Sequence, residues 1–164
     1  AVLLDERLAK VADLEPARVS MDACFPSPEE MERRIRSRFA GLDESGRIGA
    51  ECWSDYRQKL EKWHGQRVTL KHFLDEWPVV CNKLRDLVRP PEVILETLRE
   101  VGSPLTYDAL TPPVNSEDVR FAYLNAAFIR RRLTVGDLPV FLNWDQQALW
   151  SRVWAKSRAL TSNV

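Results

Sequence analysis

Apolar residues recur every three or four positions along most of the chain, which is the spacing of amphipathic helices. The clearest case begins at Ser27, a typical N-cap residue, with Pro28 at the first helical position and Glu30 completing a capping box. The apolar positions of this helix are Met31, Ile35 and Phe39. The pattern therefore predicts a helix that buries one face from its first turn to its last.

A second helix is predicted over residues 48–65, with a charged and solvated opposite face and Gly65 as its end. Its apolar stripe comprises Ile48, Cys52, Tyr56, Leu60 and Trp63. A third amphipathic stretch covers residues 68–88, in which Pro78 removes one backbone N–H and is expected to kink or split the helix.

The next predicted helix lies between Pro91 and Gly102, and its inward positions are Val93, Ile94, Leu98 and Val101. Residues 119–130 predict a core helix on which Phe121, Leu124 and Phe128 share one face. The last predicted helix starts from a capping pair, Asn143 and Gln146, and carries Leu149 and Val153. Because no stretch alternates like a strand, residues 1–164 are predicted to form a single all-α, multi-helix bundle-like domain.

The first residues place Val2, Leu8 and Val11 in helical phase without a capping residue or an initial Met. An uncapped helix start leaves backbone N–H groups unpaired, so we expect the chain to be a fragment of a longer protein.

The amino-acid composition argues against two classes of partner, nucleic acids and membranes. Lys plus Arg equals Asp plus Glu, so no net field draws the chain to nucleic acid or to an anionic membrane, and no apolar run reaches the 18 or so residues of a membrane span. The three cysteines include no CxxC pair, which favours a reducing compartment. We expect a cytoplasmic protein that binds neither nucleic acid nor membrane.

Candidate chemistry is sparse. His64 and His72 are the only histidines, and their spacing does not place them on adjacent helical turns as a metal site requires. No phosphate-cradling glycine motif and no nucleophile elbow occurs. We therefore predict no catalytic, cofactor-binding or metal-binding residue in this chain, and we interpret its six tryptophans as core or interface anchors.

Three consecutive arginines follow the predicted core helix. A projection at about 100° per residue sets Arg130 opposite the apolar face and Arg132 close to it. Arg130 and Arg131 are then explained as the solvated end of a helix. Arg132 is a candidate for an anion site or a structural ion pair, because a guanidinium is rarely buried without a partner. Thr134 and Asp137 have the spacing of a helix cap, so a new helix is predicted to start there.

The run FIRRRLTVGDL resembles the IRxRYTxLDL signature of sn-glycerol-1-phosphate dehydrogenases, members of the iron-containing alcohol dehydrogenase and dehydroquinate synthase-like superfamily. Three earlier stretches of the chain are also similar to segments of that family. Along the chain they are AVLLDERLAK, ECWSDYRQKLEKW and PPEVILETLREVGSPLTYDAL, and they occur in the same order as in the family. Arg131, Leu133 and Gly136 depart from the family's polar, aromatic and leucine positions.

This resemblance implies that the chain is the distal part of the superfamily's C-terminal helical domain. The intact parent would be an NAD(P)-linked polyol-phosphate dehydrogenase that uses zinc or nickel, with the upstream nucleotide-binding domain as a partner. The metal ligands of the parent would lie upstream, so the chain alone is expected to be inactive and to self-associate through uncovered apolar faces. The alternative is a free-standing helical protein-interaction module that binds a partner through its tryptophan-rich faces.

Overall fold

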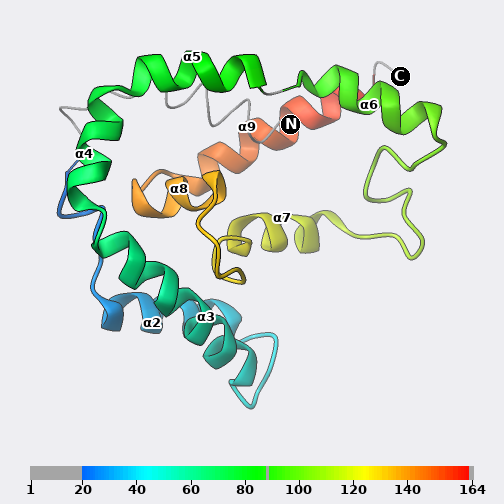
Figure 1. Ribbon diagram of the computed structural model, residues 1–164. Coiled ribbons are helices and arrows are strands. Elements are labelled where there is room, and N and C mark those ends of the chain that lie inside the picture. The colour runs from blue at the N-terminus through cyan, green and yellow to red at the C-terminus, as the bar shows by residue number, and fades with distance from the viewer. Residues whose placement is uncertain (1–19, 88, 163–164) are drawn as a thin grey trace. The chain divides into compact units, whose positions relative to one another are not determined.

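The computed structural model describes residues 20–87 and 89–162, and these residues form eight α-helices, one 3-10 helix and connecting turns, with no strand among them (Figure 1). The prediction of an all-α fold is confirmed. The helices are α2 (Pro28–Phe39), α3 (Arg47–His64), α4 (Arg67–Asp75), α5 (Trp77–Leu87), α6 (Pro91–Glu100), α7 (Ser116–Asn125), η2 (Val135–Asp137), α8 (Leu138–Phe141) and α9 (Gln146–Ser162). None of the described helices has the length and apolar character that a membrane crossing requires. The predicted N-terminal helix lies outside the described residues.

The chain divides into two compact units. Among the described residues, unit 1 comprises residues 73–123 and 145–162, and unit 2 comprises residues 20–72 and 124–144. The boundaries fall inside α4, inside α7, and between α8 and α9. The prediction of one domain over residues 1–164 stays a prediction, and each unit is described by itself.

In unit 2, α2 packs against α3. Ser27 caps α2 as predicted, with its side chain accepting a hydrogen bond from the Glu30 backbone N–H, and the predicted apolar face of α2 is buried. Gly49 of α3 permits the close approach, because a Cβ at this position would lie 3.2 Å from the Cα of Arg36. The two helices therefore meet backbone to backbone where the sequence supplies no side chain.

Aromatic side chains form a second part of the unit 2 core. Trp63 of α3 stacks on Phe141 of α8 with ring centroids 4.2 Å apart, and Tyr56 packs against Phe128 at 5.4 Å. Such pairs add to the free energy of burying their apolar area. The Nε1–H of Trp63 donates to the backbone carbonyl of Cys24, so this buried indole is satisfied.

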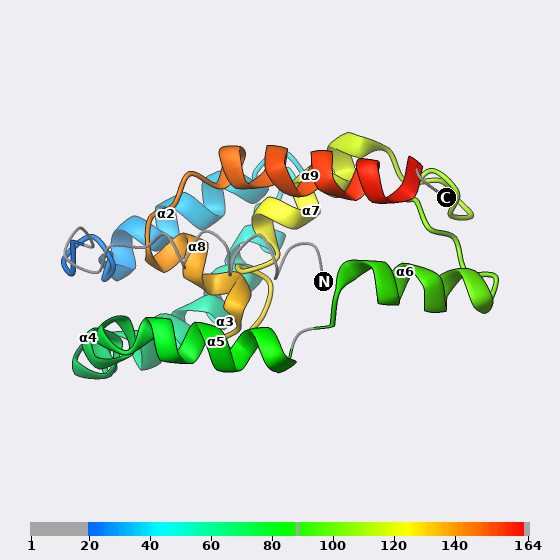
Figure 2. The ribbon, with the colours of Figure 1, turned by 90° about the horizontal axis from the view of Figure 1, so that it is seen from above.

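In unit 1, α7 and α9 lie side by side (Figure 2). The ring centroids of Tyr123 and Trp150 are 5.0 Å apart, and Arg120 donates a hydrogen bond to the side-chain carbonyl of Gln147. The third predicted helix is split as expected: α4 ends at Asp75 and α5 begins at Trp77, directly before Pro78. Gly102, with φ +68°, ends α6 as predicted.

Four details of the sequence prediction are wrong. In α3, Trp53 and Lys59 are buried, whereas Ile48, a member of the predicted apolar stripe, is exposed. At α6, the predicted inward positions Val93, Ile94 and Val101 are exposed. The cap of α9 is Asp145, which accepts from the N–H groups of Gln147 and Ala148, and not Asn143. Helix α7 ends at Asn125, so the arginine triplet does not belong to it.

Candidate functional site

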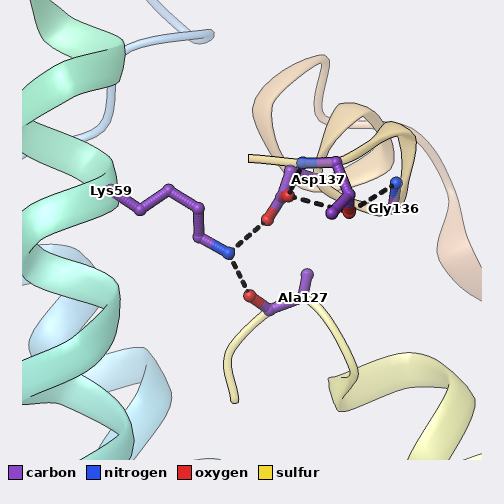
Figure 3. Close-up of polar contacts among 5 residues, drawn as sticks. Lys59, Ala127, Gly136 and Asp137 are labelled. Atoms are coloured by element: carbon purple, nitrogen blue, oxygen red, sulfur yellow. Dashed lines mark hydrogen bonds and ion pairs between the residues drawn. The ribbon is translucent and has the colours of Figure 1, made fainter. Parts of the chain in front are cut away.

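Unit 2 contains a buried ion pair between Lys59 of α3 and Asp137 at the end of η2 (Figure 3). The distance from Lys59 Nζ to Asp137 Oδ1 is 2.5 Å, and each side chain is 1% exposed. Lys59 Nζ also donates to the backbone carbonyl of Ala127 and lies 4.7 Å from the centroid of the Tyr56 ring. One ammonium group thus holds two points of the chain that are ten residues apart.

The second carboxylate oxygen of Asp137 holds the turn that begins at Thr134. Asp137 Oδ2 accepts from the Thr134 backbone N–H at 2.7 Å and from its hydroxyl at 3.1 Å. The Thr134 hydroxyl in turn accepts from the Gly136 N–H at 3.1 Å. These contacts form a capping box for η2 in which Asp replaces the usual Glu or Gln. The same carboxylate therefore caps a helical turn and neutralises a buried lysine.

Burial dominates the electrostatics of this cluster. Desolvation lowers the pKa of Lys59 from its ordinary value, and the hydrogen bond and charge of Asp137 oppose that change. Desolvation also raises the pKa of Tyr56, with the charge of Asp137 acting in the same direction. The Tyr56 hydroxyl has no hydrogen-bond partner among the described residues.

The arrangement is structural rather than catalytic. Lys59 is paired and enclosed, so no substrate reaches its Nζ, and a paired ammonium is not a nucleophile. Its effect is to fix both ends of the stretch from Ala127 to Asp137 against α3.

Sequence reasoning missed Lys59 because lysine was assigned to the solvated face of its helix. The spacing of Lys59 from its apolar neighbours could have indicated that it is buried. Lys59 lies three residues after Tyr56 and four before Trp63, so it shares their buried face. A lysine at such a position predicts a buried carboxylate or carbonyl partner.

The arginine triplet lies between the two points that Lys59 holds. Arg131 pairs with Asp55 of α3, with Nε 2.6 Å from Oδ1, and its side chain is largely exposed. Arg130 and Arg132 are exposed and make no ion pair among the described residues. The projection that set Arg132 over an apolar face does not apply, because α7 ends before it. The anion site at Arg132 stays a prediction.

Unit 1 contains a groove of about 720 Å³ between α6, the segment that follows it, α7 and α9, which we call the α6–α9 groove. Its lining includes Ile94 and Leu98 of α6, Val119 of α7, and Trp150 and Trp154 of α9. The lining positions recur at three- and four-residue spacing on each helix, so each helix turns one apolar face to the groove. A space of this size is typical of a binding site.

Metal-binding chemistry is not assembled in the described residues, where no group of three or more His, Cys, Asp or Glu side chains could hold an ion. His64 lies with its Nε2 2.9 Å from the Pro26 carbonyl oxygen, and His72 is exposed. Cys24 is buried and Cys52 is partly buried.

No protein-family model, curated protein or solved structure matches the chain. The resemblance of residues 128–138 to the sn-glycerol-1-phosphate dehydrogenase signature stays a prediction. Within unit 2 this run includes two fully buried side chains, Phe128 and Asp137.

Proposed function

We propose that the chain is a helical protein-interaction module whose α6–α9 groove binds an amphipathic helix of a partner protein. The observation that supports this proposal is the groove itself. Three helices and one connecting segment line it with apolar and aromatic side chains, and several of these remain exposed. Ile94 is 38% exposed and Leu110 is 39% exposed. Burying them against a partner removes apolar surface from water, which favours association.

A helix is the occupant that fits the lining. The groove presents side chains of α6 and α9 at helical spacing, among them Ile94, Leu98, Trp150 and Trp154. An amphipathic helix offers its own apolar residues at the same three- and four-residue intervals, so the two sets can interdigitate. Tryptophan side chains are frequent binding anchors, because each buries a large area with few rotatable bonds.

The charge of the groove lining indicates which charge the partner helix should carry. Among the described residues that line the groove, Asp118 is the only charged one. A partner helix with a lysine or arginine beside its apolar stripe complements this carboxylate, whereas a glutamate there is repelled. The proposed partner is therefore an amphipathic helix with a basic flank.

The test uses designed peptides. An 18-residue peptide with leucines at helical spacing and one lysine beside them is titrated into the chain by calorimetry, alongside a scrambled peptide of equal composition. We expect saturable binding of the helical peptide alone, and weaker binding when its lysine is replaced by glutamate. Leu98→Glu in the groove should abolish binding, while the matched Val93→Glu, on the same helix but outside the lining, should not.

Three results would overturn the proposal. The scrambled peptide binding equally well would show non-specific adsorption. Unchanged binding by Leu98→Glu would place the peptide elsewhere. Saturable binding of a small apolar dye that the helical peptide cannot displace would indicate a small-molecule site instead.

A second candidate is the C-terminal helical part of an NAD(P)-dependent polyol-phosphate dehydrogenase. It is favoured by the ordered sequence resemblance, including the run from Phe128 to Leu138. In the proposed parent, NAD(P) and zinc or nickel are held upstream, and unit 2 serves as packing. The coding sequence upstream of Ala1 tests this directly. A glycine-rich phosphate-binding turn followed by an Asp and two His would support the dehydrogenase, and an unrelated upstream sequence would eliminate it.

A further inference from the structure

The five residues from Ile129 to Leu133, which we call the arginine loop, are all exposed. Ile129 is 52% exposed and Leu133 is 53% exposed. Arg131 is paired with Asp55, but Arg130 and Arg132 make no hydrogen bond or ion pair among the described residues. Two uncovered apolar side chains beside two unpaired cations form a small surface suited to an acidic, partly apolar partner.

Hydrogen bonds to Lys59 fix the chain on both sides of the arginine loop. Two residues before Ile129, the carbonyl of Ala127 accepts from the buried Lys59, and four residues after Leu133 the carboxylate of Asp137 binds the same ammonium. The ends of this stretch are thereby fixed to α3. A loop fixed at both ends loses less conformational entropy on binding, so even a small surface can bind measurably.

The complementary surface exists on the same chain, on α6 of unit 1. Glu92, Glu96 and Glu100 recur every four residues and form one stripe, which we call the acidic face of α6. At about 100° per residue, this stripe lies opposite Ile94 and Leu98, which line the groove. The three glutamates are exposed and have no cationic partner among the described residues.

The spacings of the two surfaces match. Glu92 and Glu96 are separated by about 6 Å of helix rise, and two residues of extended chain place Arg130 and Arg132 at most about 7 Å apart. Val93 is 41% exposed and lies beside this stripe in the same projection, where it offers an apolar contact to the flanks of the loop.

We propose that the arginine loop of one copy docks on the acidic face of α6 of a second copy. Every copy carries both halves, so the contact is head-to-tail, and it leaves the α6–α9 groove open for its own partner. Exposed ion pairs are individually weak and are screened by salt. The association is therefore weak and falls as ionic strength rises.

Sedimentation velocity of the full chain over a concentration series tests this proposal. We expect self-association at low salt that is reduced at high salt. Arg130→Glu/Arg132→Glu should lower the association constant by about tenfold or more, and so should Glu92→Arg/Glu96→Arg. Each of these variants keeps one intact half of the contact. An equimolar mixture of the two should therefore associate again, because the intact loop of one variant meets the intact acidic face of the other, although each variant alone associates far more weakly.

Matched controls reverse equal numbers of charges elsewhere. Arg33→Glu/Arg47→Glu and Glu44→Arg/Glu76→Arg change exposed residues outside both surfaces and should associate like the unaltered chain. Circular dichroism checks the helix content of each variant. If a charge reversal reduces the helix content, the neutral Gln variants at the same positions replace it, with a smaller loss of association expected.

Three results would overturn the proposal. The unaltered chain could remain monomeric at every concentration and salt. The control variants could lose association as strongly as the test variants. The mixture could fail to form a complex although each variant is folded, which would show that the two surfaces do not meet between copies.

Discussion

Lys59 and Asp137 are 78 residues apart in the sequence, yet they form a buried ion pair within unit 2, with Nζ and Oδ1 2.5 Å apart and both side chains 1% exposed. Desolvating two charges is costly, and their mutual attraction offsets that cost only when hydrogen bonds satisfy the remaining positions. Here the Ala127 carbonyl and the Thr134 cap supply those bonds. The pair is therefore stable as a set, and removing one member should be far worse than its net contribution suggests.

Lys59→Met should lower the free energy of unfolding by about 3 to 5 kcal/mol, because it leaves the buried Asp137 carboxylate without its partner. Urea unfolding followed by circular dichroism measures the change. Lys62→Met, an exposed lysine on the same helix, is the matched control and should change stability by less than about 0.5 kcal/mol.

A double-mutant cycle separates the pair from the packing around it. Asp137→Asn keeps the acceptor that caps Thr134 but removes the charge, so Lys59→Met/Asp137→Asn should be less destabilised than the sum of the two single variants. Additive losses would show that Lys59 and Asp137 act independently, contrary to the structure.

Tyr56→Phe should not destabilise the chain at neutral pH, although the side chain is fully buried. The Tyr56 hydroxyl has no hydrogen-bond partner among the described residues, so the substitution loses no bond and removes an unsatisfied polar group. We expect a free energy of unfolding equal to that of the unaltered chain or up to about 1 kcal/mol higher. A loss of several kcal/mol would mean that the hydroxyl is hydrogen-bonded in the folded protein.

The difference in stability between Tyr56→Phe and the unaltered chain should also depend on pH. Burial raises the pKa of Tyr56 well above its ordinary 10.0 in the folded state. Above about pH 10 the unfolded chain therefore releases this proton while the folded chain keeps it, so stability falls as pH rises. Tyr56→Phe lacks this loss, and its advantage over the unaltered chain should grow from about pH 10 upward. Tyr107→Phe, which removes the hydroxyl of an exposed tyrosine, is the matched control.

The sequence predicted several helix boundaries that local chemistry determines. Ser27 and Pro28 determine the start of α2, Pro78 splits the third helix, and Gly102 ends α6. These features depend on residues close in sequence, so the pattern contains them. Which face of a helix is buried depends instead on what packs against it.

The sequence pattern does not show which element packs against a helix, and for this reason the predictions for α6 and for Lys59 were wrong. Apolar residues of the predicted α6 stripe, such as Val93 in the helix and Val101 just after it, remain exposed because no described element covers them. Lys59 is buried because Asp137, far along the chain, supplies its charge partner. The α6–α9 groove is equally non-local, because it combines residues from segments as distant as Pro91 and Thr161.

The arginine triplet yields a prediction opposite to the one that a helical projection supports. Arg130 and Arg132 are exposed and unpaired among the described residues, so replacing either with alanine should change stability by less than about 0.5 kcal/mol. Arg131→Ala should cost no more than about 1 kcal/mol, because its pair with Asp55 is mostly exposed. A loss at Arg132 several-fold larger than at Arg130 would restore the buried ion pair that its position first suggested.

The start of α9 depends on Asp145, whose Oδ1 accepts from the N–H groups of Gln147 and Ala148 at 3.0 Å each. These two N–H groups lie in the first turn and have no carbonyl partner within the helix. Asp145→Ala leaves both without the cap and should lower the free energy of unfolding by about 1 kcal/mol, whereas Asp145→Ser should retain most of it. Asn143 is the informative comparison, because its side chain does not cap the helix and its φ of +50° is a conformation that glycine adopts without strain. Asn143→Gly should therefore be close to neutral while Asp145→Ala is not, and thermal unfolding of the two variants in parallel measures both. A larger loss at Asn143 than at Asp145 would mean that α9 begins two residues earlier than the structure places it.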